Sequence, residues 1–260
     1  MTSVLNSKLR CKKFRKRILD LSQKVTALHI GGSFSSAEIM DLIYFSLMKK
    51  SERDSFILSK GHASILHYVI LEYLKILKKK DLEMYCKPKG FLGVHPDIGT
   101  PGINASTGSL GHGLSMAAGM AIANLNSNKK TYVIISDGEL QEGSTWEAII
   151  SIGALNLKNL VLFVDNNDLN SSEKMSDTHP NLYPIDKKFK SFGWDSKICD
   201  GHNLSKMLNA VNKRDKRKPF ALVAKTKKGY PVKFMNNAIW HYRSPTKKEY
   251  AKALAEIERH

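Results

Sequence analysis

The sequence predicts an α/β fold, in which a parallel sheet carries helices on both faces. Three short runs rich in β-branched and large apolar residues support this prediction, at 131–135, 160–164 and 220–224. Helical patterns near 145–155 and 204–211 separate these runs, and strands that alternate with helices imply parallel pairing. The chain has 260 residues, of which 42% are hydrophobic, and this is enough for one large domain with a substantial core.

Residues 1–30 are predicted to form an opening helix. Its apolar residues recur at steps of three and four and form one buried stripe, made of Ile18, Leu21, Val25 and Leu28. Only basic charges precede Asp20, and such a run is usually a solvated helix face. An organelle presequence is the alternative, whereas a secretory signal is excluded because no apolar segment follows the basic residues.

Further elements are predicted before the first strand. Gly31-Gly32 indicates a break, and a second helix is expected to start near Ser35 or Ser36, with Glu38 completing a capping box. A third helix is expected over 63–79, with His67 as a structural residue on it. Residues 86–107 are rich in Pro and Gly and predict a long ordered loop, and small residues over 111–125 predict a closely packed helix.

The composition argues against several classes of protein. No apolar run approaches the roughly 18 residues that span a bilayer, so we expect no membrane segment. Cys11, Cys86 and Cys199 are widely spaced, which argues against a disulfide framework or a cysteine zinc site and favours a cytoplasmic protein. The net charge of +17 is spread along the chain without a nucleic-acid-reading motif, so we expect no nucleic-acid partner.

Oxygen ligands follow two of the predicted strands. Asp137 comes directly after the strand at 131–135, and Asn167 follows the strand at 160–164. Ligands of parallel sheets bind beyond the carboxyl ends of the strands, where both residues are expected. Their oxygens suit magnesium or calcium, and Gly138 lets the backbone approach a phosphate. Each motif alone is more typical of an ordinary turn that closes a strand.

Together the two motifs resemble a known family. Asp-Gly, about 30 residues, then Asn-Asn is similar to the diphosphate and metal motif of thiamine-diphosphate enzymes, and the segment Asp-Gly-Glu-Leu-Gln-Glu-Gly-Ser-Thr-Trp-Glu-Ala resembles transketolase. His29 and His241 fall where that family has its first and last active-site histidines. Other segments match in the same order: Ser59-Lys60-Gly61-His62-Ala63, Gly93-Val94-His95-Pro96 and Ser106-Thr107-Gly108-Ser109-Leu110-Gly111-His112-Gly113.

The resemblance implies a thiamine-diphosphate-binding fold and a set of site residues. The implied ligands of Mg²⁺, or of Ca²⁺ or Mn²⁺ in its place, are Asp137, Asn167 and the carbonyl of Leu169. The implied contacts to thiamine diphosphate are His62, Gly108, Ser109, Leu110, Asp137, Gly138, Glu139, Asn167 and His241. The implied catalytic residues are His29, His62, His95, His241 and Glu142. Imidazoles can shuttle protons to and from ketose hydroxyls, and Glu142 is expected to contact a glutamate of the partner.

Two departures from the family pattern affect these expectations. Ser136 stands where the family usually has Gly, and its Cβ is expected to crowd the phosphate without preventing binding. The chain is also expected to have no second domain, which in the family supplies the glutamate that activates the cofactor. We therefore expect residues 1–260 to form a single domain, the cofactor-diphosphate-binding half of a split transketolase. A complementary chain would complete a heterotetramer.

The implied activity is transfer of a two-carbon ketol unit between sugar phosphates. Deoxyxylulose-phosphate synthase is a rival that residues 59–63 and 141–143 disfavour. A related transferase for a specialised sugar stays open, because most of the substrate pocket would lie on the other half. A non-catalytic cofactor-binding scaffold is disfavoured because Asp137, Asn167 and the histidines are all present. The hypothesis that the chain binds nucleic acid is supported by the net charge alone.

Overall fold

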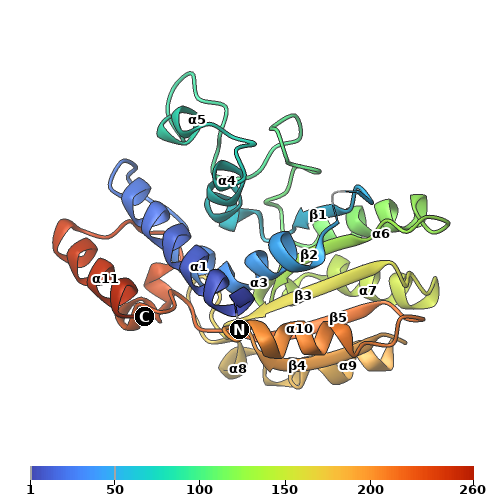
Figure 1. The fold of residues 1–260 in the computed structure, drawn as a ribbon. Coiled ribbons are helices and arrows are strands. Elements are labelled where there is room, and N and C mark those ends of the chain that lie inside the picture. Colours follow the sequence, from blue (N-terminus) through green and yellow to red (C-terminus); the bar gives the residue numbers. More distant parts are fainter. Residues whose placement is uncertain (1, 50) are drawn as a thin grey trace.

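The computed structural model describes residues 2–49 and 51–260 and contains one parallel sheet. Its strands are β1 (Ser55–Leu58), β2 (Thr131–Ser136), β3 (Leu160–Asn166), β4 (Asp195–Asp200) and β5 (Phe220–Lys225). Their order across the sheet is β1-β2-β3-β5-β4 (Figure 1). The predicted fold class is confirmed, and β2, β3 and β5 lie at the three predicted runs.

The two outer strands, β1 and β4, were not predicted. β1 has only four residues, all buried, which is too short a run to show a period. β4 reads Asp-Ser-Lys-Ile-Cys-Asp and is only partly buried. An edge strand pairs on one side alone and therefore tolerates charged residues that weaken its sequence pattern.

Helices cover both faces of the sheet. The helices packed on one face are α1 (Thr2–Ser22), α3 (Ala37–Leu42), α4 (Ser64–Tyr73) and α10 (Leu204–Asn212). Those on the other face are α6 (Gly113–Ala123), α7 (Gly143–Ala154) and α9 (Ile185–Ser191) (Figure 1). Successive strand residues point to opposite faces. Phe163 of β3 therefore joins the first core, while its neighbours Leu162 and Val164 join the second.

Short elements connect these layers. The remaining α-helices are α2 (Ile30–Ser35), α5 (Lys79–Glu83), α8 (Met175–Thr178) and α11 (Lys247–Arg259). Single helical turns of other types are η1 (Ile43–Leu47), η2 (Gly61–Ala63), η3 (Gly138–Gln141), η4 (Pro180–Leu182), η5 (Lys233–Met235) and η6 (Ala238–Trp240). Residues 86–107 contain no helix or strand, as predicted, and α6, α7 and α10 lie at predicted helices.

Three predicted helix boundaries were wrong. The opening helix ends at Ser22, not at residue 30. Gly31 and Gly32 do not break a helix but lie inside α2, where a Cβ at Gly31 would stand 2.7 Å from the Trp240 carbonyl oxygen. The third helix, α4, ends at Tyr73, because Lys75 takes a left-handed φ of 61°.

The predicted capping box at Ser35 or Ser36 was also wrong. Ser36 precedes α3, but its side chain makes no capping hydrogen bond there. Its hydroxyl donates instead to the Gly32 carbonyl and to Asp165, and the Glu38 carboxylate binds Arg15. The side chains of Ser36 and Glu38 therefore bind residues distant in sequence and do not form the local capping hydrogen bonds.

The basic run of α1 is predicted to be a solvated face, but part of it is buried. Arg15 is buried and pairs with Glu38 through both of its terminal nitrogens, at 2.6 and 2.7 Å. Arg10 pairs with Asp41, and Arg17 pairs with Glu72. These ion pairs fasten the opening helix to α3 and α4, so part of the basic run has a structural role.

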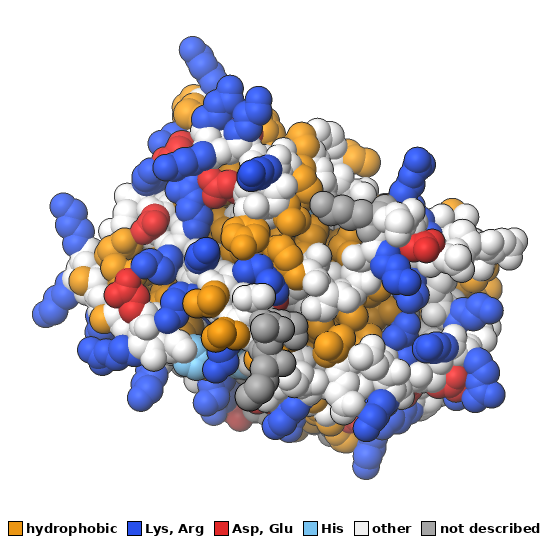
Figure 2. All heavy atoms as spheres, viewed as in Figure 1, with side chains coloured by type: hydrophobic (Ala, Val, Ile, Leu, Met, Phe, Trp, Pro, Cys, Tyr) orange, Lys and Arg blue, Asp and Glu red, His pale blue; other side chains and the backbone are white. Residues whose placement is uncertain are grey.

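Charged side chains cover much of the surface. Figure 2 shows Lys and Arg scattered over the visible face, with apolar side chains gathered near its centre, and no single basic stripe crosses this face. Among the described residues, no helix combines the length and the apolar character needed to cross a membrane.

The buried Arg15–Glu38 pair generates a stability prediction. Arg15→Met is expected to lower the free energy of unfolding by about 3–5 kcal/mol, because it leaves the Glu38 carboxylate buried without its cation. Urea unfolding at pH 7 measures the loss. Lys16→Met is the control: it removes a charge from the same helix, but its pair with Glu258 is exposed, so stability should hardly change. Equal losses in both variants would contradict a special role for Arg15.

Candidate active site

A pocket of about 390 Å³ opens at the carboxyl ends of β2 and β3. Most of the predicted site residues line it: His29, His62, His95, Gly108, Leu110, Asp137, Gly138, Glu142, Asn167, Leu169 and His241. Ser109 and Glu139 do not. A larger cavity of about 600 Å³ lies between α1, α10 and the end of α11, but none of the predicted site residues lines it. The smaller pocket holds the reactive groups and is the candidate active site.

Asp137 stands at the end of β2 and is buried. Its Oδ1 accepts a hydrogen bond from the backbone N–H of Gly138 at 2.9 Å, and its Oδ2 accepts from Asp168 N–H at 2.6 Å and from Asn166 Nδ2 at 3.0 Å. Burial, and then the nearby Asp165 carboxylate, raise the pKa of Asp137 to about 6. A cation at this carboxylate would favour its charged form.

The donor set at this end of the pocket fits a hard divalent cation. Asp137, Asn167 and Leu169 all line the pocket, and they offer a carboxylate, an amide oxygen and a backbone carbonyl. Asn167 Oδ1 accepts the Leu169 N–H at 3.1 Å, so the two residues form one turn. Oxygen donors of these three kinds suit Mg²⁺, Ca²⁺ and Mn²⁺. The described residues contain no cluster of three His, Cys, Asp or Glu side chains of the kind that holds zinc.

Four imidazoles from four separate segments meet in the same pocket. The ring centroid of His29 lies 5.3 Å from that of His62, 5.2 Å from that of His241 and 6.4 Å from that of His95. His29 precedes α2, His62 lies in η2, His95 lies in the long loop, and His241 follows η6. The structure therefore brings all four predicted histidines together.

Most of these imidazoles are held neutral. Burial, followed by His241 and His95, lowers the pKa of His29 to about 3, and burial followed by Lys228 and Lys60 lowers that of His241 to about 4. The pKa of His62 also falls well below its ordinary value, mainly through burial. A neutral imidazole can accept a proton from a hydroxyl and can donate its own N–H to another oxygen.

The predicted structural role of His67 is confirmed. Its ring is buried on α4 and its Nε2 lies 2.5 Å from the hydroxyl of Tyr44. It packs edge-on against Phe56 of β1. This histidine therefore belongs to the core and not to the pocket.

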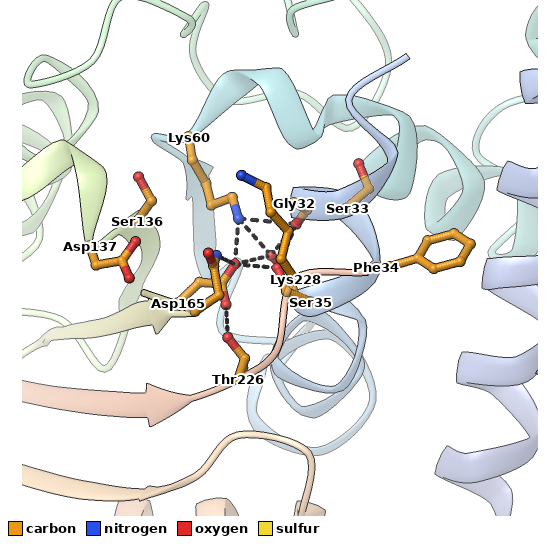
Figure 3. Close-up of polar contacts among 12 residues, drawn as sticks. Gly32, Ser33, Phe34, Ser35, Lys60, Ser136, Asp137, Asp165, Thr226 and Lys228 are labelled. Atoms are coloured by element: carbon orange, nitrogen blue, oxygen red, sulfur yellow. Dashed lines mark hydrogen bonds and ion pairs between the residues drawn. The ribbon is translucent and has the colours of Figure 1, made fainter. Parts of the chain in front are cut away.

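A buried lysine–aspartate pair was not predicted from the sequence. Lys60 Nζ donates to the Asp165 carboxylate, to the Gly32 carbonyl and to the Ser36 hydroxyl (Figure 3). Burial acts to raise the pKa of Asp165, but the Lys60 ammonium outweighs it and keeps the pKa below its ordinary value. Asp165 also accepts from Asn167 Nδ2 at 3.4 Å, which orients that amide.

A second lysine in the pocket, Lys228, was not predicted either. Its Nζ donates to the carbonyl oxygens of Leu169 and Asn170, at 3.2 and 2.7 Å, and lies 3.3 Å from His241 Nδ1. Burial, and then Lys60, lower its pKa to about 8. Only the position of Lys228 beyond the end of β5 could have indicated this role, since ligands gather at that edge of the sheet.

Three predicted residues have different surroundings from those expected. The Glu139 carboxylate is buried and accepts from the Ser59 hydroxyl and from the Gly111 N–H, so it holds the loop that contains Gly108. Ser109 is exposed outside the pocket. The Ser136 hydroxyl turns back to accept the Glu139 N–H at 3.1 Å, which occupies a backbone donor that a phosphate could have used.

Only glycine fits at position 108, because the ring of His95 packs against its backbone. The φ of Gly108 is 146°, and a Cβ at this position would stand 2.7 Å from the ring of His95. An L side chain would therefore be strained and would displace the imidazole. The glycine lets the backbone and His95 lie together at the pocket wall.

Comparisons with known proteins identify the family of the chain. Residues 7–256 match the family described as "Transketolase, thiamine diphosphate binding domain". The chain is 34% identical to one of the apulose-4-phosphate transketolase subunits, from Phocaeicola vulgatus, over 96% of this chain and 92% of that protein. It is 35% identical to the 6-deoxy-6-sulfo-D-fructose transketolase subunit SqwG of Clostridium sp., over 94% of each.

Longer proteins match over only part of their length. The human transketolase is 34% identical over 86% of this chain, which covers 37% of that protein. The solved transketolase of Leishmania mexicana superposes with a TM-score of 0.88 at 23% identity, over 97% of this chain and 41% of that one. At 23% identity this superposition shows only that the two proteins share a fold.

The histidine cluster generates a titration prediction. His29 and His241 are expected to stay neutral as the pH falls from 7 to 5, because their pKa values in the folded chain are about 3 and about 4. The unfolded chain takes up these protons near its ordinary pKa of 6.5, so both residues reduce stability as the pH falls below that value. Imidazole ¹⁵N shifts measure the titration, with His29→Gln and His241→Gln assigning the signals. Midpoints near pH 6.5 in the folded chain would contradict the prediction.

Proposed function

The chain belongs to the transketolase family and corresponds to its thiamine-diphosphate-binding domain, and from this premise we propose that it transfers a two-carbon ketol unit between sugar phosphates. It would do so as the cofactor-diphosphate-binding half of a two-chain enzyme, with Mg²⁺ at Asp137, Asn167 and the Leu169 carbonyl. The observation that carries the proposal is one pocket in which hard oxygen donors face a cluster of four histidines.

Each group of pocket residues has its own role in the proposed reaction. Thiamine diphosphate, when bound, would supply the nucleophilic carbon for this chemistry. Asp137 and Asn167 would hold the metal beside the diphosphate, and Gly108 and Gly138 would let the backbone approach the cofactor. His29, His62 and His241 are held neutral by burial, so each can donate an N–H to a ketose oxygen and accept a hydrogen bond from a ketose hydroxyl. His95 lines the pocket and is exposed, so it is open to an incoming sugar.

A complementary chain is part of the proposal. Two relatives that match over nearly their full length are named as subunits, and this chain spans about two fifths of the single-chain transketolases it matches. Glu142 lines the pocket and is exposed, so its carboxylate is open to a glutamate of another chain. We propose that residues 1–260 act as one domain and that two copies of each chain assemble in the cytoplasm, where the three free cysteines would stay reduced.

The sugar is proposed only by class. The names of the two relatives reported above refer to apulose 4-phosphate and to a sulfonated deoxyfructose, which favours a specialised ketose over the common pentose phosphates. Both are anionic, and the pocket contains Lys60 and Lys228 together with neutral imidazoles. A ketose of this specialised anionic class is therefore favoured as a substrate of the proposed ketol transfer.

Reconstitution tests the function as a whole. The tagged chain is purified from its host with thiamine diphosphate and Mg²⁺ present, and any stoichiometric partner is recombined with it. Ketol transfer between anionic sugars by the pair, but not by either chain alone, is expected. A chain recovered without a partner and without transfer activity would favour a cofactor-binding scaffold instead.

Loss of the metal carboxylate should abolish metal-dependent cofactor binding. Asp137→Ala is expected to weaken thiamine diphosphate binding in the presence of Mg²⁺ by at least about a hundredfold, because the ion loses its charged ligand. Calorimetric titration measures the affinity, and a thermal melt checks the fold. Asp177→Ala is the control, since this exposed carboxylate lies in α8, outside the pocket. Undiminished affinity in Asp137→Ala would remove this residue from the metal site.

Loss of His95 should lower turnover and leave cofactor binding nearly unchanged. His95→Ala in the reconstituted enzyme is expected to lower kcat by about 10²–10⁴-fold, the usual contribution of a general acid or base, with little change in cofactor affinity. Steady-state kinetics and calorimetry separate the two effects. His112→Ala is the matched control, because this imidazole is also exposed but lies outside the pocket. Unchanged kinetics in His95→Ala would place the long loop away from the reaction.

A further inference from the structure

Lys228 makes its contacts where a metal ligand is expected. Its ammonium donates to the Leu169 and Asn170 carbonyls and lies against His241 Nδ1, while its side chain is buried. We propose that in the cofactor-free chain Lys228 occupies the carbonyl oxygen that the metal requires, and that metal and diphosphate displace it together. This inference rests on the proposed function, since it takes Leu169 as a metal ligand.

The ammonium and a divalent cation cannot share the Leu169 oxygen at low cost. Mg²⁺ binds its oxygen ligands at about 2.0–2.1 Å, and Lys228 Nζ already lies 3.2 Å from the same oxygen. Two cations on one carbonyl repel each other, and this repulsion is stronger in a partly buried pocket than in bulk water. The turn that contains Leu169 is therefore held in shape by an internal cation, and metal binding must first remove it.

The two pocket lysines differ in how firmly they are held. Lys60 has a carboxylate partner, Asp165, and two further acceptors. Lys228 forms no ion pair with any carboxylate in the described part of the chain, and its three donors meet two carbonyls and one imidazole. Lys60 is thus fixed by charge, whereas Lys228 is held by neutral groups and is free to change partners.

A diphosphate would provide the anion that Lys228 lacks. Lys228 lines the same pocket as Asp137 and Gly138, so an anion placed there comes within its reach. Its ammonium would leave the carbonyls for the phosphate oxygens, and the vacated Leu169 oxygen would then face the metal. Each ligand would remove the obstacle to the other, which is positive coupling between the two binding events.

Metal binding in the absence of cofactor tests this exchange. Mn²⁺ suits the same oxygen donors, and free Mn²⁺ is counted by electron paramagnetic resonance. Lys228→Met keeps an unbranched side chain of similar shape and removes the charge, so it is expected to bind Mn²⁺ alone about tenfold more tightly than the original chain. Thiamine diphosphate should strengthen Mn²⁺ binding in the original chain about tenfold more than in Lys228→Met.

Controls separate this exchange from a general charge effect. Lys227→Met removes the same charge from the adjacent exposed position and is expected to bind Mn²⁺ alone as the original chain does. Lys228→Gln is a second neutral variant, which should show the same tightening if the Met variant fails to fold in a thermal melt. No tightening in either folded variant, relative to Lys227→Met, would overturn the inference while leaving the proposed function intact. Absence of Mn²⁺ binding in the original chain with thiamine diphosphate present would overturn both.

Discussion

The buried ion pair between Lys60 and Asp165 is the interaction on which the pocket depends. Asp165 lies near the end of β3, and its carboxylate accepts from Ser35 and Ser36 of the α2–α3 turn, from Lys60 beyond β1 and from Thr226 beyond β5 (Figure 3). Removing both charges from water is costly, and the cost is offset only because every donor and acceptor is satisfied. One carboxylate thereby ties together the carboxyl ends of three strands and a helix.

The hydrogen bonds of Asp165 fix the relative positions of the pocket residues. His29 directly precedes α2, whose serine binds Asp165, and His62 lies two residues after Lys60. Asn167, two residues after Asp165, is oriented by the same carboxylate. The histidine cluster and Asn167 are therefore positioned from one point, so displacement of Asp165 would move both together.

Burial, and then the positive charge of nearby groups, explains why the imidazoles of the pocket are neutral. Lys60 and Lys228 supply two positive charges beside His29 and His241, in a setting that burial has already made unfavourable for a third. The rings consequently remain neutral. The lysine charges are balanced by carboxylates, because Asp137 and Glu142 also line the pocket and Asp165 pairs with Lys60. The neutral rings can each donate one hydrogen bond and accept another.

The sequence by itself determined the fold class and the placing of Asp137 and Asn167 after strands, since strand runs and turn motifs are short-range properties, and its resemblance to a family indicated the other pocket residues. It predicted Asp137, Asn167 and four histidines, which the structure brings into one pocket. Only the tertiary structure decided which charges are buried and with which partners. Lys60 and Asp165 are 105 positions apart, and Arg15 and Glu38 are 23 apart. Nothing local distinguishes such a lysine or arginine from a solvated one, because its environment is created by segments that meet only when the sheet has formed.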